Sequence, residues 1–243
     1  MSEQEWALRV DLAAALRLAH SFDWTESVGN HFSAVLPEAP GVFLMNPRWM
    51  LFSAVRASDL MRLDWTDKET MARPNPPDRS GRCIHSQIHA LNPAARVVLH
   101  IHPPYATALA GLIDPTLKPI DQVTARFWGM VATDSGFEDV AVTEQEGQRL
   151  SVLLGDKSVL MMGNHGLTVA GPDIPAAFEE LYLFERACRT LMLAYGSGQP
   201  LNVMSDKVAA AVARGWLTCR EMAHHHFGQL KHQLDAADPS YAT

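Results

Sequence analysis

Residues 97–104 constrain the fold most, because this stretch is an apolar run that carries His100 and His102 near its end. In a β-strand, residues i and i+2 point to the same face, so both imidazoles can present ring nitrogens to one point. A third histidine, His165, lies in a glycine-flanked turn after a second apolar run. Three protein ligands with an open position are typical of a catalytic metal site. Half-buried, hydrogen-bonded core histidines are the alternative, and the pair alone does not decide between the two.

The composition excludes several classes of partner. The chain has 243 residues, of which 47% are hydrophobic and 19% charged, an ordinary globular balance with enough length for a sizeable core. A formal net charge of -7 argues against non-specific nucleic-acid binding. The sequence has no apolar run of about eighteen residues, so no membrane span is predicted. Cys83, Cys188 and Cys219 are widely spaced and predict free thiols. Together with the absence of a signal-peptide pattern, they favour a cytoplasmic location.

Helical and strand patterns interleave along the chain without a strict βαβ rhythm. A turn at 57–64 feeds a strand, 74–81 is a loop by composition, and further strands are predicted at 29–36, 41–47, 97–102, 130–133, 158–162 and 167–170. Helices are predicted at 6–22, 84–91, 105–112, 121–129, 143–154, 174–195 and 205–235. This pattern favours one α/β or α+β domain over residues 1–243 with a mostly antiparallel central sheet.

Six motifs follow one another between about residue 6 and residue 205: Gly29-Asn30-x-Phe32-Ser33, Ala57-Ser58-Asp59-Leu60, Ile84-His85-x-x-Ile88-His89, His100-x-His102, Gly163-Asn164-His165-Gly166-Leu167 and Glu185-x-Ala187-Cys188. Their order and spacing resemble the class II aldolase/adducin head-domain family, whose best-studied enzymes cleave sugar phosphates. The resemblance implies an αβα sandwich with a nine-stranded, mainly antiparallel sheet. It also implies a homotetramer with active sites between subunits.

The resemblance also implies roles for particular residues. His100, His102 and His165 match the ligands of one divalent metal ion, and the sequence does not choose among zinc, manganese and iron. Asn30 and Ser33 match part of the rim that binds a small-molecule substrate.

Three positions depart from the family pattern. Sugar-phosphate aldolases carry a glutamate four residues before the position of His85, as a metal ligand and base, and this chain has Gly81 there. A tyrosine that acts as the acid aligns with Gln122, whose amide cannot donate a proton at neutral pH. Arg48 stands in a segment where the family has a phosphate-binding turn. We therefore assign Gly81 to the substrate-binding positions and Gln122 to the catalytic positions. Neither residue can supply the base or the acid that the aldolases have there.

Two arginines and two histidines complete the candidate site. Arg126 and Arg48 can bind a substrate carboxylate, because a guanidinium matches a carboxylate with two parallel hydrogen bonds. The alternative for each arginine is a surface or interface ion pair. His85 lies one helical turn before His89, and either can relay protons or serve as a buried structural histidine. We favour His85 for the catalytic role.

His224, His225 and His226 form a run within a predicted helix. Consecutive residues of a helix point about 100° apart, so the three cannot chelate one metal ion together. We expect them on a solvated or inter-subunit surface.

Three functions remain open. The first is a divalent-metal-dependent C–C lyase, of decarboxylase or aldolase type, that acts on a small carboxylated oxo- or hydroxy-substrate, aromatic compounds included. The second is a non-haem Fe(II) oxygenase that acts on an aromatic 2-oxo acid. The third is a non-catalytic, adducin-like scaffold, against which the intact histidine triad argues.

Overall fold

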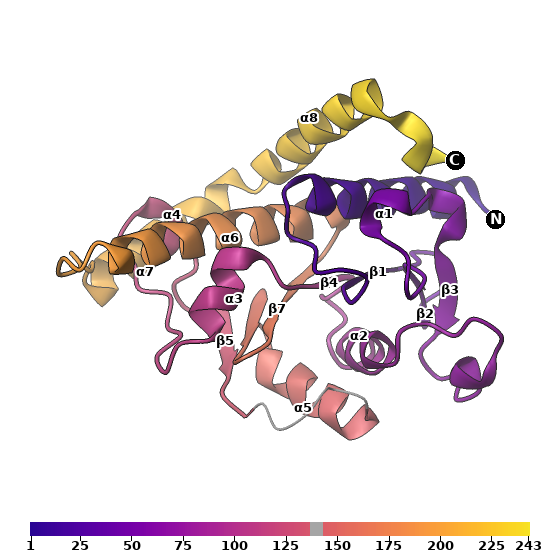
Figure 1. The fold of residues 1–243 in the computed structure, drawn as a ribbon, viewed down its shortest axis with the longest axis horizontal. Helices are drawn as coiled ribbons and strands as arrows, with labels where there is room; N and C mark the ends of the chain where they lie inside the picture. The colour runs from indigo at the N-terminus through magenta and orange to yellow at the C-terminus, as the bar shows by residue number, and fades with distance from the viewer. Residues whose placement is uncertain (137–142) are drawn as a thin grey trace.

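The computed structural model describes residues 1–136 and 143–243, and these form one seven-stranded sheet with helices on both faces (Figure 1). The strand order is β3-β2-β1-β4-β7-β6-β5, and β5 and β6 are parallel while the other neighbours are antiparallel. The strands are β1 (His31–Val35), β2 (Val42–Met45), β3 (Met61–Asp64), β4 (Val97–Ile101), β5 (Val131–Asp134), β6 (Val159–Met162) and β7 (Gly166–Gly171). The predicted αβα sandwich with a mainly antiparallel sheet is confirmed, with seven strands among the described residues where the family pattern implied nine.

The helices divide between the two faces of the sheet (Figure 1). Along β4, Val97 and Leu99 pack in the core beneath α1 and α6, whereas Val98 packs in a second core beneath α2 and α5. The helices are α1 (Glu3–Ser21), α2 (Arg79–Leu91), α3 (Pro104–Ala110), α4 (Gln122–Arg126), α5 (Glu144–Leu154), α6 (Ile174–Gly196), α7 (Asp206–Trp216) and α8 (Glu221–Ala237). Short 3-10 helices occupy Phe52–Ala54, Ala57–Asp59, Thr70–Ala72, Leu217–Cys219 and Pro239–Ala242.

Side-chain caps set several helix boundaries. Thr143 accepts a hydrogen bond from the backbone N–H of Glu146, as its spacing predicted, and begins α5. Asp78 accepts from the backbone N–H of Gly81, so α2 begins at Arg79, inside the segment predicted as a loop. The helix predicted over 205–235 is two helices, α7 and α8, separated by a 3-10 turn.

The strand register positions the polar residues that matter for function. His31 of β1 pairs with His100 of β4, and His100 pairs in turn with Thr168 of β7. Three polar side chains therefore lie in one row across the face of the sheet that α2 covers. Among the described helices, none combines the length and the apolar character that a membrane span requires.

Candidate metal centre

Three histidines from two segments meet at one edge of the sheet. His102 directly follows β4, and His165 lies in the turn that joins β6 to β7. Antiparallel pairing of Ile101 with Leu167 puts the end of β4 beside the start of β7. The ligand nitrogens offered by His100, His102 and His165 all lie within 4.8 Å of one another. The structure therefore brings together the three residues predicted as metal ligands.

Polar neighbours hold two of these imidazoles in place. His100 Nδ1 lies 3.0 Å from Thr168 Oγ1, and His102 Nδ1 lies 2.5 Å from a carboxylate oxygen of Glu26. The Thr168 hydroxyl contacts Met162 Sδ at 3.5 Å, which leaves its oxygen free to accept from His100. The Nε2 atoms of His100 and His102 lie 3.1 Å apart, and donation from both Nδ1–H groups to these partners would leave the Nε2 lone pairs directed at each other. A cation removes the repulsion between these lone pairs, so the donor set fits a divalent metal ion.

Gly166 makes the close approach of His102 possible. A Cβ at position 166 would lie 2.3 Å from His102 Cδ2 and 2.9 Å from the carbonyl oxygen of Ile101. Neither atom can move without displacing a ligand or the end of β4. The glycine after His165 is therefore part of the construction of the centre.

Burial keeps His100 and His165 in the form that can bind a metal ion. It lowers the pKa of His165 to about 4, and the neighbouring His102 lowers that pKa further. Burial holds the pKa of His100 well below its usual range. Both side chains are therefore neutral at pH 7, with a lone pair available to a cation.

A chain of buried side chains leads from the metal centre into the space beneath α2. The ring of His31 stacks on that of His100, with 4.7 Å between ring centroids. His31 Nδ1 lies 2.8 Å from His85 Nε2. The hydroxyl oxygen of Ser33 lies 2.5 Å from His85 Nδ1 and 2.7 Å from His89 Nε2. Ser33, which was predicted at the substrate-binding rim, and His85, which was predicted to be catalytic, thus belong to a hydrogen-bonded chain behind the metal centre.

The imidazoles of this chain are uncharged at neutral pH. Burial lowers the pKa of His31 and of His89 to about 4, and it places the pKa of His85 well below its usual range. His89 Nδ1 also lies 2.7 Å from the carbonyl oxygen of Ala95. Neutral imidazole both donates and accepts, so a continuous chain of hydrogen bonds is satisfied without any net charge.

His31 fills the space beside Gly81. A Cβ added at position 81 would lie 2.9 Å from two ring carbons of His31 and 3.3 Å from its Nδ1. A side chain at this position cannot coexist with the observed ring of His31. The structure therefore gives a steric reason for the glycine at the position where the family pattern has a glutamate.

Asn30 directly precedes His31, the first residue of β1. Its side-chain oxygen accepts a hydrogen bond of 2.7 Å from the backbone N–H of Glu26, whose carboxylate holds His102. Its amide nitrogen is buried, and no acceptor for it exists among the described residues. A buried donor without an acceptor is unusual in proteins, and it suits the binding of a substrate oxygen.

The remaining predicted residues have contacts with other side chains. Arg48 stacks its guanidinium 4.0 Å from the ring centroid of Trp49. Gln122 is exposed at the start of α4, and its carbonyl oxygen accepts a hydrogen bond from Trp216 Nε1. Arg126 forms an ion pair of 2.6 Å with Glu180 and lines two cavities, and none of the three histidines lines either of them.

The run of histidines lies on α8. His225 is exposed, while His224 lies 3.2 Å from a carboxylate oxygen of Asp173 and His226 lies 2.5 Å from one of Glu179. These contacts join α8 to the start and the first turns of α6. The three imidazoles do not share one point, as their spacing predicted.

Sequence reasoning missed three side chains of the centre. His31 carries a usable signal, since it stands two residues before Ser33 in a strand and so shares its face. Thr168 of β7 is the cross-strand partner of His100, and only the observed strand pairing reveals this. Glu26 comes from a loop, and no periodic pattern places a loop residue beside a histidine 76 positions away.

Comparison with known proteins agrees with this fold. Residues 10–192 match the family model described as Class II Aldolase and Adducin N-terminal domain. An aldolase II superfamily protein from Pseudomonas syringae is 33% identical, with a TM-score of 0.89 over 100% of this chain and 98% of that chain. L-fuculose 1-phosphate aldolase from Glaciozyma antarctica PI12 is 24% identical, with a TM-score of 0.82 over 98% of this chain and 92% of that chain, which shows a common fold.

Two curated relatives carry names of enzymes. Decarboxylase NovR of Streptomyces niveus is 27% identical over 85% of this chain and 76% of its own length. A protein of Streptomyces roseochromogenus subsp. oscitans, named 4-hydroxy-3-prenylphenylpyruvate oxygenase/4-hydroxy-3-prenylbenzoate synthase, is 25% identical over 81% of this chain and 68% of its own length. The matched family model covers most of the chain, and the chain belongs to the class II aldolase and adducin N-terminal domain family.

Proposed function

We propose that this protein is a divalent-metal-dependent lyase that breaks a C–C bond in a small carboxylated oxo- or hydroxy-compound, aromatic compounds included. His100, His102 and His165 would hold the ion. When bound, a divalent cation polarises a carbonyl oxygen and stabilises the charge that develops on it as the adjacent C–C bond breaks. The observation that supports this proposal most is the convergence of three imidazoles, two of them oriented from behind by Thr168 and Glu26.

Decarboxylation is the reaction type that the residues favour. Position 81 is a glycine, and the ring of His31 fills the space beside it. No carboxylate at position 81 can therefore serve as a base. An aldol cleavage requires a base to remove a hydroxyl proton, whereas loss of CO₂ needs no base at the step of bond cleavage. The similarity to the relative named Decarboxylase NovR is consistent with this choice.

Two residues are assigned to substrate. The amide nitrogen of Asn30 is a buried donor whose acceptor would be a substrate oxygen. Arg48 would bind the carboxylate, because it lies two residues beyond Asn46, whose side chain bonds to the carbonyl oxygen of Asn30 and the N–H of Phe32. The Ser33 hydroxyl and His85 would orient His31, and through it the stacked ring of His100.

Gln122 and Arg126 require a neighbouring copy of the chain to take part. Within one chain, Arg126 lines cavities that contain none of the ligands. We propose a homotetramer in which α4 of one subunit approaches the metal centre of the next. Native mass spectrometry gives the assembly directly, and a monomer would remove both residues from the active site.

An Fe(II) oxygenase acting on an aromatic 2-oxo acid is the second candidate. It is favoured by the relative whose name includes 4-hydroxy-3-prenylphenylpyruvate oxygenase. The ligand set argues for placing it second, because non-haem Fe(II) oxygenases commonly use two histidines and one carboxylate. Among the described residues, the cluster contains three histidines, and the carboxylate of Glu26 contacts His102 Nδ1 from outside it.

Elemental analysis followed by a substrate screen tests the proposal. Purified wild-type protein should carry about one metal ion per chain, His165→Ala should carry much less, and the control His225→Ala, at an exposed position of α8, should match wild type. A panel of aliphatic and aromatic oxo- and hydroxy-acids is then assayed for CO₂ and carbonyl products, with and without oxygen. Turnover without oxygen supports the lyase, whereas turnover that requires oxygen supports the oxygenase. Equal metal content in wild type and His165→Ala would contradict the lyase and the oxygenase, and the non-catalytic, adducin-like scaffold would remain as the candidate function.

A further inference from the structure

Helix α3 connects the backbone segments that carry two of the proposed metal ligands. It begins at Pro104, two residues after His102. At its other end, the carbonyl oxygen of Ala110 accepts a 3.1 Å hydrogen bond from the backbone N–H of Asn164. Asn164 directly precedes His165. The helix therefore joins the chain beside one ligand to the chain beside the other.

The link between His102 and α3 is short and stiff. Pro103 and Pro104 follow His102, and the pyrrolidine ring fixes the φ angle of each proline, which is -70° at Pro103. A movement of the first turn of α3 therefore has few torsion angles in which to be absorbed before it reaches His102.

A carboxylate from another helix caps the start of α3. Glu185 of α6 accepts hydrogen bonds of 2.9 Å from the backbone N–H of Tyr105 and 2.8 Å from that of Ala106, one on each oxygen. The first turn of a helix leaves such N–H groups without partners, and Pro103 at the N-cap supplies no side-chain acceptor. Arg189, one turn further along α6, has its guanidinium 5.5 Å from the ring centroid of Tyr105. Helix α6 therefore holds the first turn of α3.

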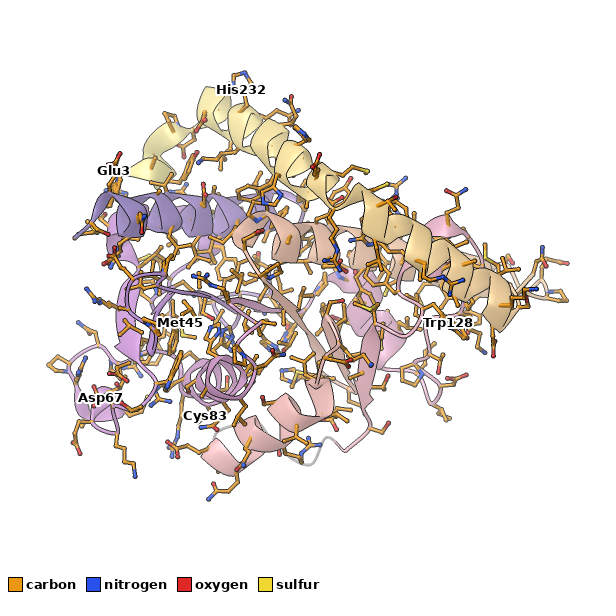
Figure 2. All side chains as sticks on the ribbon, turned by 180° about the vertical axis from the view of Figure 1, so that it is seen from behind. Glu3, Met45, Asp67, Cys83, Trp128 and His232 are labelled. Atoms are coloured by element: carbon orange, nitrogen blue, oxygen red, sulfur yellow. The ribbon has the colours of Figure 1, made fainter. Side chains whose placement is uncertain are left out.

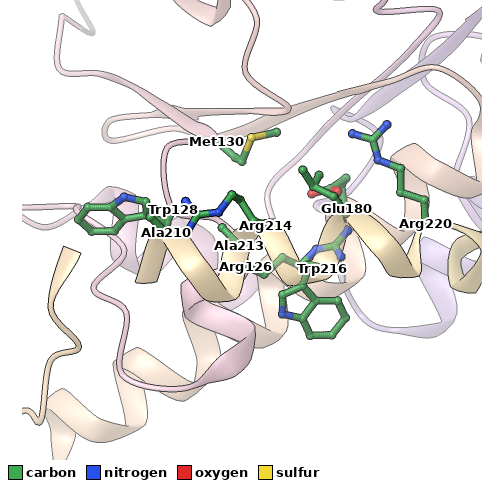
Figure 3. Close-up of a pocket in the computed structure, with 10 residues that line it drawn as sticks. Arg126, Trp128, Met130, Glu180, Ala210, Ala213, Arg214, Trp216 and Arg220 are labelled. Carbon is green, nitrogen blue, oxygen red and sulfur yellow. Dashed lines mark hydrogen bonds and ion pairs between the residues drawn. The ribbon is translucent and has the colours of Figure 1, made fainter. Parts of the chain in front are cut away.

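Two other glutamates of α6 bind side chains instead of a helix start. A carboxylate oxygen of Glu179 lies 2.5 Å from His226 Nδ1. Glu180 forms an ion pair of 2.6 Å with Arg126, and both residues line the cavity shown in Figure 3. Glu185 differs because both of its oxygens bind backbone groups of another helix. A change at Glu185 therefore acts on the position of that helix.

Helix α3 supports the metal centre from the face of the sheet that α6 covers. The buried residues of α3 pack in the same core as α1 and α6, and they are Ala106, Leu109 and Ala110. The buried chain that starts at His31 lies beneath α2, on the other face. Figure 2 shows Cys83 of α2 and His232 of α8 at opposite sides of the molecule. The centre is therefore supported by His31 on one face and by α3 on the other.

We propose that Glu185 is a positioning residue of the metal centre, which fixes the first turn of α3 and thereby the place of His102 relative to His165. This inference rests on the proposed function, because it requires a metal ion at the three histidines. Metal ligands bind tightly only when the surrounding groups hold them close to the coordination geometry. Glu185 contacts Tyr105 and Ala106, so it acts through the backbone of α3.

Variants at Glu185 test this inference through the metal affinity of the full-length protein. Metal-free protein is titrated with Zn²⁺ against a competing chelator at pH 8.5, where the Glu185 carboxyl, whose pKa burial raises to about 7, is ionised. Glu185→Gln keeps the size of the side chain but turns an amide NH₂ group, which cannot accept, toward one of the two N–H groups. We expect this variant to bind Zn²⁺ about 10-fold more weakly than wild type. Glu185→Asp keeps both oxygens at a shorter reach and should fall between the two.

Glu179→Gln is the matched control, because both glutamates lie on α6 and each is 5% exposed. It should bind Zn²⁺ as wild type does. The visible spectrum of the Co²⁺-loaded protein reports ligand geometry, which a loss of stability alone does not change. We expect its bands to shift in Glu185→Gln and to stay in place in Glu179→Gln. Urea unfolding checks that the metal-free variants are folded, and if Glu185→Gln does not fold, Glu185→Asp carries the same test.

The possible outcomes separate this inference from the proposed function. A Zn²⁺ affinity and a Co²⁺ spectrum of Glu185→Gln equal to those of wild type would overturn the inference and leave the proposed function intact. An equal loss of affinity in Glu179→Gln would also overturn it, because the effect would then belong to α6 as a whole. Zn²⁺ binding by wild type no tighter than by His165→Ala would instead refute the metal centre, and with it both the proposed function and the role of Glu185.

Discussion

The imidazole of His31 occupies the space into which a side chain on Gly81 would project. A Cβ at position 81 would come within 2.9 Å of two ring carbons of His31, closer than carbon atoms pack in proteins. His31 cannot easily move, since its ring stacks on His100 and its Nδ1 contacts His85. The two positions are therefore coupled, and the identity of one limits what the other can carry.

This coupling predicts the behaviour of Gly81→Ala. We expect this variant to lower the free energy of unfolding by about 1–3 kcal/mol, as overpacking of a filled interior does. In a His31→Ala background the same change should cost less by at least about 0.5 kcal/mol, because the space is vacant. Urea unfolding of the four proteins in the cycle measures both values.

The control for this cycle is Gly228→Ala on α8, where an added Cβ meets no atom within 4 Å. That change should stabilise the protein slightly, as alanine does in an open helix position. Additive effects of Gly81→Ala and His31→Ala would show that the two residues are not in steric conflict.

The sequence predicted that the three histidines lie close together, and the structure confirms this, because strand periodicity fixes which side chains share a face. His100 and His102 are two residues apart, and that spacing alone aligned them. It did not identify His31 as their neighbour, because the partner of a strand and its register depend on contacts between distant segments. The helix boundary at Arg79 was missed for a local reason, namely the cap that Asp78 supplies within a proline-rich stretch.

The placement of Arg126 shows a different limit. Its spacing from Gln122 was compatible with a substrate contact, and the structure shows it paired with Glu180 of α6 at the other edge of the sheet. Periodicity tells which face of a helix a side chain occupies, but not which edge of the sheet the helix adjoins. That information comes only from the path of the chain between β4 and β5.

Thr168 and Glu26 should tune metal affinity through the ligands that they orient. Thr168→Val removes the hydroxyl beside His100 Nδ1, and Glu26→Gln removes the charge beside His102 Nδ1. Loss of such outer partners typically weakens metal binding by about 10–100-fold. Titration of metal-free protein with Zn²⁺ against a competing chelator measures the change. Glu38→Gln, an exposed glutamate that contacts Ser2, is the control, and unchanged affinity in both test variants would contradict the prediction.

Acid should destabilise the metal-free protein through its buried histidines. The folded-state pKa of His89 is lowered to about 4 from its ordinary value of 6.5, so this group adds stability above pH 6.5 that is lost as the pH falls toward 4. The loss attributable to His89 is roughly 2–3 kcal/mol over this interval. Unfolding measured at several pH values should show a smaller loss for His89→Gln than for wild type. The exposed His232→Gln should follow wild type, and parallel curves for all three proteins would contradict the assigned role of burial.

Glu185 is expected to make the free energy of unfolding depend on pH with a sign opposite to that of His89. Its carboxylate accepts hydrogen bonds of 2.9 and 2.8 Å from the backbone N–H groups of Tyr105 and Ala106, at the start of α3, yet burial raises its pKa to about 7. A raised pKa means that this group contributes stability below its ordinary pKa of 4.5, and that the contribution is lost as the pH rises through 7.

The comparison of wild type with Glu185→Gln isolates this contribution, because every other titrating group is common to both proteins. Between pH 6 and pH 8.5, we expect wild type to lose about 1 kcal/mol of unfolding free energy relative to Glu185→Gln. Urea unfolding of metal-free protein at these two pH values measures the difference. If the gap between the two proteins stays constant, the Glu185 carboxyl ionises at its ordinary pKa, and burial beneath α3 does not govern its charge.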